Sequence, residues 1–279
     1  MSLKGVIVVA AAANAVSYAA WYVTRWYKRG VDIYDVNAGT STDKAIYLIG
    51  GCMSRTAKPF RFITEHIGGD ISADTSVHYV EYRNLGLDVE AARLAVKEHI
   101  DKREYREVTF VAVSMGYQLI MGVAREYDKV IGLNPCVGAR SLAPKMRKLI
   151  PVLPAVWGPS IAIGWLMQLP IVKVDGPAYS LQLVLDQLSI CANGAHVKFG
   201  FRPDVLVLSI YDELVNNDVL LRLARQGERR RSRDGSLTEK IKGRQMELRR
   251  LPTGHFGVGE NHGYYEIIMP FFKDGGSAK

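Results

Sequence analysis

Apolar residues follow two different periods along most of the chain. Short apolar runs rich in β-branched residues predict strands, which would be buried on both faces of a sheet. The expected strands span residues 45–49, 77–82, 108–113, 129–133, 204–210 and 245–251, with an alternating edge strand within 31–36. Apolar residues spaced three and four positions apart predict helices at 56–67, 89–100, 115–125 and 264–272. Such alternation of strands and helices predicts an α/β fold with a doubly wound, mostly parallel sheet.

Two regions depart from this alternation. Residues 136–202 are rich in proline and in large apolar side chains, and they interrupt the strand–helix pattern before the strand at 204–210. Residues 1–30 contain a hydrophobic segment that precedes the first expected strand. We therefore expect one large domain at 31–279, because 279 residues with 48% hydrophobic content suffice for a sizeable core.

The hydrophobic segment at 5–23 carries no charge and is just long enough to cross a bilayer as a helix. Aromatic residues cluster at its end, and Arg25, Lys28 and Arg29 follow, which favours a membrane anchor with the domain on the cytoplasmic side. Two other interpretations stay open. Ala13-Asn14-Ala15 fits a signal-peptide cleavage site, which would give a secreted protein, and the alanine-rich composition also suits a helix packed on the domain.

The charge and the cysteines exclude some classes of function. The net charge is +8, but the basic residues concentrate late in the chain and lack interleaved aromatic residues, so we expect no nucleic-acid partner and favour association with a membrane surface. Cys52, Cys136 and Cys191 lie far apart in the sequence and match neither a disulfide framework nor a metal motif. No metal ion or organic cofactor is implied.

Ser114 follows the apolar run at 108–113 and precedes the predicted helix at 115–125. A serine on a sharp strand-to-helix turn needs small neighbours two positions away on each side, and Ala112 and Gly116 supply them. Such a turn holds the hydroxyl clear of the sheet and points the free N–H groups of the helix start toward it. Ser114 is therefore a candidate nucleophile beside a site that can stabilise an oxyanion.

This stretch resembles the nucleophile elbow of the α/β-hydrolase family, Gly-x-Ser-x-Gly, with Ala112 in place of the first glycine. The resemblance extends over residues 45–272 and implies an acid and then a histidine, each on a loop after a later strand. Asp212 in Tyr211-Asp212-Glu213-Leu214-Val215 resembles the acid, although Asp is also a preferred helix N-cap residue. His255 in the loop 252–257 resembles the base, and His262 is its chief rival.

The resemblance also implies an oxyanion hole. In the family, the loop after the strand at 45–49 supplies one backbone N–H, and here that loop reads Gly50-Gly51-Cys52-Met53. The expected donors are the N–H groups of Cys52 and Met115, with Gly51 next to the substrate. Gly50 stands where the family commonly has histidine.

Residues 136–202 occupy the position where many α/β hydrolases insert a helical cap. Its apolar residues, among them Trp157 and Trp165, suggest contact with an apolar acyl group. The resemblance therefore implies a serine hydrolase that cleaves an ester or thioester through an acyl-enzyme. Two other classes stay open: an acyltransferase or peptidase with the same triad, and an inactive membrane-tethered binding protein.

Overall fold

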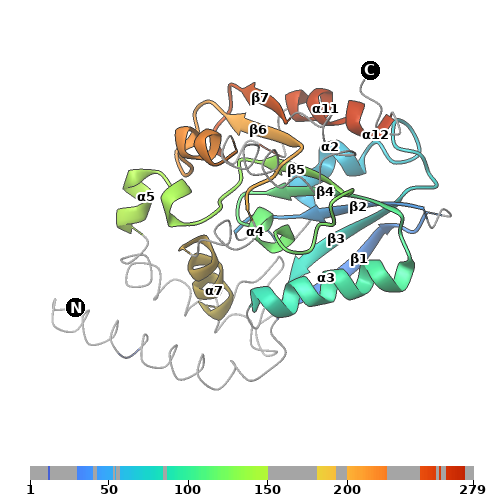
Figure 1. Cartoon of the computed structure of the whole chain (residues 1–279), viewed down its shortest axis with the longest axis horizontal. Coiled ribbons are helices and arrows are strands. Elements are labelled where there is room, and N and C mark those ends of the chain that lie inside the picture. The colour runs from blue at the N-terminus through green and yellow to red at the C-terminus, as the bar shows by residue number, and fades with distance from the viewer. Residues whose placement is uncertain are drawn as a thin grey trace, which may run out of the picture.

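The computed structural model describes residues 12, 30–39, 43–52, 54, 57–83, 87–149, 181–192, 200–224, 246–255, 258 and 262–273. Its centre is a seven-stranded sheet in the order β1-β3-β2-β4-β5-β6-β7 (Figure 1). β1 pairs antiparallel with β3, and the other neighbours pair in parallel. The strands are β1 Val31–Asn37, β2 Lys44–Ile49, β3 Ser76–Tyr82, β4 Glu107–Val113, β5 Lys129–Leu133, β6 Val205–Ser209 and β7 Glu247–Leu251.

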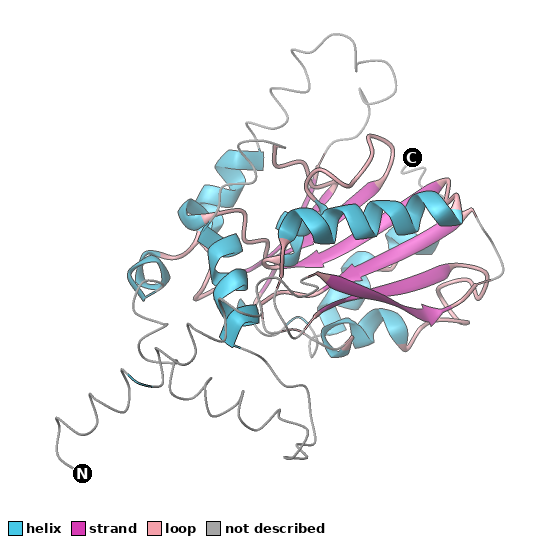
Figure 2. Cartoon of the chain, turned by 90° about the horizontal axis from the view of Figure 1, so that it is seen from below, coloured by secondary structure: helices cyan, strands magenta, loops and turns pink. Residues whose placement is uncertain are grey.

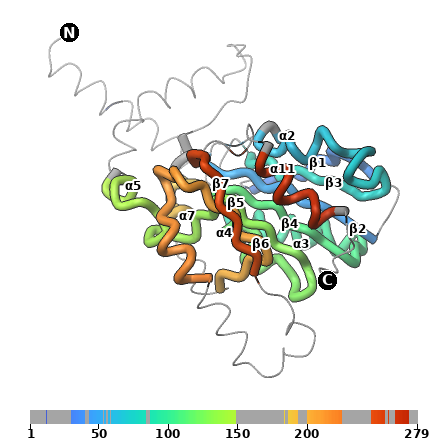
Figure 3. The backbone as a smooth tube through the Cα atoms, turned by 90° about the horizontal axis from the view of Figure 1, so that it is seen from above, coloured from blue at the N-terminus to red at the C-terminus, as the bar shows by residue number. Residues whose placement is uncertain are grey.

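Helices cover both faces of this sheet (Figure 2). The named helices are η1 Lys58–Phe60, α2 Arg61–Thr64, α3 Val89–Arg103, α4 Gly116–Ile120, η2 Ala139–Ser141, α5 Pro144–Leu149, α7 Leu181–Ala192, α11 His262–Ile268 and α12 Pro270–Lys273, and residues 217–224 are also helical. One apolar cluster packs α3, α4 and α7 on the first face. A second cluster packs α2 and α11 on the other, and Figure 3 shows these two helices side by side although they come from opposite ends of the chain.

The seven predicted strands agree with the structure to within two residues, whereas the predicted helices are less accurate. The helix expected at 115–125 ends at Ile120, because Met121 is extended and Gly122 has a positive φ of 89°. The helix expected at 264–272 divides into α11 and α12 next to Pro270, which lacks the N–H needed to continue a helix. The helix expected at 56–67 is reduced to η1 and α2.

Several predictions fall outside the described residues. Of the segment at 5–23 the structure describes Ala12 alone, and it does not describe 150–180, which includes Trp157 and Trp165. In the described part of the chain, no helix combines the length and apolar character needed to cross a membrane. Within 136–202, the described residues include η2, α5 and α7, and the division into a domain and a cap stays a prediction.

Candidate active site

Ser114 lies on a strained turn directly after β4. Its φ is +51°, a left-handed conformation that costs a non-glycine residue about 1–3 kcal/mol. Two backbone hydrogen bonds hold it there: its N–H donates to the Leu133 carbonyl and its carbonyl accepts from the Cys136 N–H, each at 2.9 Å. The end of β5 and the chain just after it therefore fix the serine in this conformation.

The small residues predicted around the turn are required by its close packing. Ala112 is fully buried. A Cβ atom on Gly116 would lie 2.4 Å from the Gly50 carbonyl oxygen, a distance that no real structure tolerates. A Cβ atom on Gly51 would lie 2.9 Å from the Ser114 Cβ, so the predicted substrate-contacting Gly51 does lie against the serine.

A chain of hydrogen bonds connects the three side chains that the sequence singled out. Ser114 Oγ lies 2.9 Å from His255 Nε2, and His255 Nδ1 lies 2.9 Å from Asp212 Oδ2 and 3.1 Å from Oδ1. An ionised carboxylate only accepts hydrogen bonds, so Nδ1 carries the proton and Nε2 can accept from the serine hydroxyl. The structure thus brings together residues separated by up to 141 positions in the chain.

These groups lie largely out of solvent. Ser114 is 8% exposed, the His255 side chain 5% and the Asp212 side chain 0%. The carboxylate of Asp212 is also held by the backbone, because the N–H groups of Leu214 and Val215 donate to its Oδ1 at 2.9 and 2.7 Å. These bonds fix the direction of the carboxylate.

The helix at 217–224 has a different N-terminal cap from the one considered for Asp212. Asn216 Oδ1 accepts from the N–H groups of Asp218 and Val219 at 3.1 and 3.3 Å. Asp212 therefore closes the turn before this helix, and its second oxygen is available for His255. Glu213, which the sequence did not single out, accepts a hydrogen bond from the His255 backbone N–H at 3.2 Å.

The loop after β2 lies beside the serine and is held by two tyrosines of β3. The Tyr82 hydroxyl donates to the Gly50 carbonyl, and the Tyr79 hydroxyl donates to the Ser54 carbonyl. Within the described residues, no hydrogen bond uses the backbone N–H of Cys52 or of Met115, the two expected oxyanion donors. Cys52 Sγ lies 3.3 Å from Cys191 Sγ, so α7 packs against this loop.

The structure describes no side chain for three of the candidate site residues. His262 is the first residue of α11, but its side chain is outside the described part. Trp157 and Trp165 lie in the segment 150–180, which is not described. Their predicted roles stay predictions.

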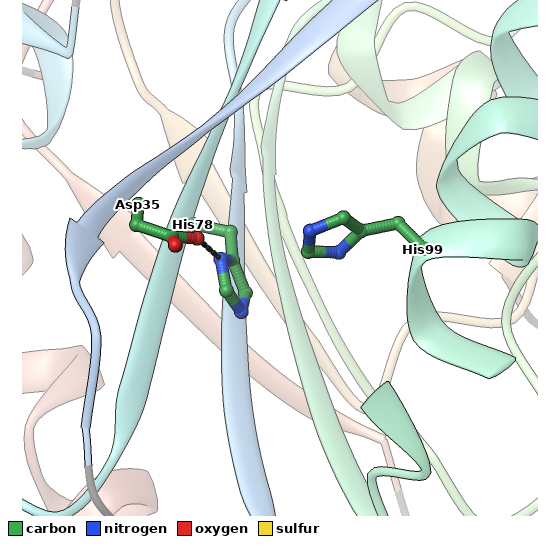
Figure 4. Close-up of side chains that lie close together, drawn as sticks. All are labelled: Asp35, His78 and His99. Atoms are coloured by element: carbon green, nitrogen blue, oxygen red, sulfur yellow. Dashed lines mark hydrogen bonds and ion pairs between the residues drawn. The ribbon is translucent and has the colours of Figure 1, made fainter. Parts of the chain in front are cut away.

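A separate cluster of one aspartate and two histidines joins β1, β3 and α3. Ligand atoms of Asp35, His78 and His99 lie within 4.8 Å of one another, and Figure 4 shows His78 between the other two. Both nitrogens of His78 already have partners, namely Asp35 Oδ1 and the Tyr105 hydroxyl, each at 2.8 Å. The Arg103 guanidinium donates to Asp35 Oδ2 at 3.1 Å, and this positive charge opposes a bound cation. We therefore assign no metal site to this cluster.

Comparison with known proteins identifies the fold. No protein-family model matches the chain, and a search of the curated proteins finds no match. Solved structures do match: a carboxylesterase from the thaumarchaeon Nitrososphaera gargenis (14% identity, TM-score 0.56, covering 86% of this chain and 94% of the other) is one example. Others are an esterase from Exiguobacterium antarcticum (12%, 0.57, 89% and 97%) and a bromoperoxidase from Bacillus anthracis (12%, 0.58, 90% and 98%).

These likenesses confirm the α/β-hydrolase fold that the sequence predicted. They do not select a reaction, because esterases and a bromoperoxidase share the fold at similar identity. The function must therefore be argued from the side chains at the site.

Proposed function

We propose that this protein is a serine hydrolase that cleaves an ester or thioester of a fairly apolar acyl substrate. The observation that carries the proposal is the hydrogen-bonded chain Ser114–His255–Asp212, with its serine on a strained turn. His255 would take the proton of Ser114 as the hydroxyl attacks the carbonyl carbon, and Asp212 would balance the imidazolium that forms. The tetrahedral intermediate would then expel the alcohol or thiol of the substrate, which takes the proton from the His255 imidazolium and leaves the acyl group on Ser114. Water, with His255 again as the base, would attack this acyl-enzyme in the same way and release the acid and the free serine.

The oxyanion of each tetrahedral intermediate would be held by the N–H groups of Met115 and Cys52. Each donor of this kind contributes about 3 kcal/mol to transition-state stabilisation in comparable sites. Gly51 supports this arrangement, since only a residue without a side chain leaves room beside Ser114. The anchoring of the loop by Tyr82 and Tyr79 keeps the donors in place before substrate binds.

The apolar acyl group is inferred from two sources. The sequence of the predicted cap is rich in large apolar side chains, including Trp157 and Trp165. In the described part, Ile210 and Tyr211 are 51% and 69% exposed and directly precede Asp212, so apolar surface lies next to the acid loop. Apolar side chains at the mouth of a site favour an apolar ligand.

The test is hydrolysis of nitrophenyl esters and acyl thioesters of increasing chain length by the full-length protein. We expect turnover that increases with acyl length and is abolished by Ser114→Ala and by His255→Ala, but not by His262→Ala. Activity that depends on His262 in place of His255 would reassign the base. A folded protein that turns over none of these substrates would favour the binding-protein interpretation, and transfer to an added alcohol or amine in preference to water would favour an acyltransferase.

The location of the protein is a separate proposal. We propose that the segment 5–23 anchors the chain in a membrane, with the hydrolase domain on the cytoplasmic side, because the basic residues follow the segment. Resistance of the full-length protein to alkaline extraction of membranes would support this, and release of a shortened, secreted chain would support the signal-peptide interpretation.

A further inference from the structure

Four polar side chains are buried together next to the loops that carry Asp212 and His255. They are Asn134 after β5, Ser209 at the end of β6, Thr253 after β7 and Tyr264 in α11. Asn134, Ser209 and Tyr264 have no exposed surface, and Thr253 is 9% exposed. None of them belongs to the Ser114–His255–Asp212 chain. We call these four residues the hub.

The Ser209 hydroxyl is the centre of the hub. It accepts from Asn134 Nδ2 at 2.7 Å and lies 2.8 Å from Thr253 Oγ1 and 2.9 Å from the Tyr264 hydroxyl. The Ser209 backbone N–H donates back to Asn134 Oδ1 at 2.7 Å, so the serine and the amide bond each other twice. A hydroxyl has one donor and two acceptor sites, and all three are used here.

The hub connects the loop that carries the acid to the loop that carries the base. Ser209 lies three residues before Asp212, and the Asp212 N–H donates to the Ser209 carbonyl at 3.3 Å. Thr253 lies two residues before His255, and its carbonyl accepts from the Tyr211 N–H at 3.1 Å. The bond between the two hydroxyl groups therefore helps to set the distance between the carboxylate and the imidazole.

The hub also reaches the nucleophile. Asn134 has a φ of +45°, one of the few left-handed conformations of a non-glycine residue among the described residues. On one side of it, the Leu133 carbonyl accepts from the Ser114 N–H, and on the other, the Cys136 N–H donates to the Ser114 carbonyl. The conformation of Asn134 thus determines where both bonds to the strained serine lie.

We propose that Asn134, Ser209, Thr253 and Tyr264 are positioning residues that align the three catalytic loops with one another. The inference rests on the proposed hydrolase function. The Ser114–His255–Asp212 chain needs two hydrogen bonds near 2.9 Å between loops that follow three different strands. A buried network in which every polar group has a partner restricts the movement of each of these loops. Small displacements matter, because a shift of about 1 Å can lower a rate roughly a hundredfold.

Substitutions that remove one hydroxyl test this role. We expect Ser209→Ala and Thr253→Val each to lower kcat about tenfold with little change in KM, a smaller loss than a full 1 Å displacement causes. Thr253→Ser keeps the hydroxyl and should restore most of kcat. The loss of kcat in the double variant should be smaller than the product of the two single losses, because both substitutions remove the bond between Ser209 and Thr253.

Ser76→Ala is the matched control. Ser76 is also a buried serine, 3% exposed, but it lies at the start of β3, away from the hub. It should leave kcat unchanged, whatever its effect on the melting temperature. A lower melting temperature with no loss of kcat in Ser209→Ala and Thr253→Val would overturn the proposal, since the hub would then be structural alone.

A proton NMR measurement separates failure of the hub from failure of the hydrolase proposal. The Nδ1 proton of His255, bonded to Asp212, should give a strongly downfield signal, and His78→Gln identifies the similar signal of His78 bonded to Asp35. Ser209→Ala should shift or broaden the His255 signal, whereas Ser76→Ala should not. This signal tests the hub even if the wild-type protein hydrolyses no ester. A changed His255 signal in Ser209→Ala supports positioning by the hub, and an unchanged signal overturns the proposal.

Discussion

Among the described residues, two chains of hydrogen bonds each join a carboxylate, an imidazole and a hydroxyl group. They are Asp212–His255–Ser114 and Asp35–His78–Tyr105. In the first, the carboxylate lies 2.9 Å from Nδ1 and the hydroxyl 2.9 Å from Nε2. In the second, both distances are 2.8 Å. Distances alone therefore do not distinguish a candidate active site from a buried structural network.

The surroundings do distinguish them. Ser114 is an alcohol on a strained turn, next to the N–H groups proposed to hold an oxyanion. Tyr105 is 3% exposed, and its ring packs edge-on against Tyr47. Burial, followed by the neighbouring His99, lowers the pKa of His78 to about 4, so this histidine is neutral at pH 7 and its surroundings disfavour the charged form. A hydroxyl–imidazole–carboxylate chain becomes a catalytic candidate only where a substrate and its developing charge can be accommodated.

Removal of the two hydroxyl groups should give the largest contrast. Ser114→Ala should lower kcat for an ester by about 10⁴-fold or more, because the nucleophile is lost. Tyr105→Phe should leave kcat within about twofold and lower only the melting temperature, through loss of one buried hydrogen bond. Steady-state kinetics and thermal unfolding of both variants measure this. Comparable losses of kcat would show that the two chains are coupled and would contradict the distinction.

Neutralisation of the two carboxylates should give the next largest contrast. Asp212→Asn should lower kcat by about 10³- to 10⁴-fold, since an amide favours the wrong tautomer of His255. Asp35→Asn should leave kcat nearly unchanged, because His78 takes no part in the proposed chemistry. The check is kcat at pH 7 for both variants, with circular dichroism to verify folding. An Asp212→Asn variant of normal activity would remove Asp212 from the proposed triad.

The pH dependence of stability should report the buried histidine. The pKa of His78 is about 4 in the fold, against 6.5 for an unperturbed histidine, so the unfolded chain binds the proton more readily. The free energy of unfolding should therefore fall as the pH decreases from about 6.5 to 4, by up to about 3 kcal/mol. Urea unfolding of wild type and His78→Gln at several pH values tests this. A wild-type slope equal to that of His78→Gln would show that folding does not lower the pKa of His78.

The sequence predicted the sheet more accurately than the helices. Parallel strands buried on both faces appear as continuous apolar runs, so β2 to β6 stand out locally. Short helices are ended by single residues such as Gly122 and Pro270, whose effect depends on the packing around them. The predicted helix boundaries were wrong where one such residue interrupted an apolar period.

The sequence also singled out the three side chains that the structure brings together in the candidate site. Ser114, Asp212 and His255 each follow a strand at the carboxyl edge, so the topology itself brings them to one place. The hub was not predicted, because the bond between Asn134 and Ser209 joins residues 75 positions apart and leaves no local spacing. The chain from Asp35 to Tyr105 was missed for the same reason, since its members lie on an edge strand, an inner strand and a loop.

The most direct test of the proposed nucleophile is reaction of the full-length protein with a fluorophosphonate, followed by mass spectrometry of its peptides. We predict one adduct per chain, on Ser114, that disappears in Ser114→Ala and in His255→Ala and persists in Tyr105→Phe and His78→Gln. A folded protein that forms no adduct, or forms it on another residue, would contradict the account.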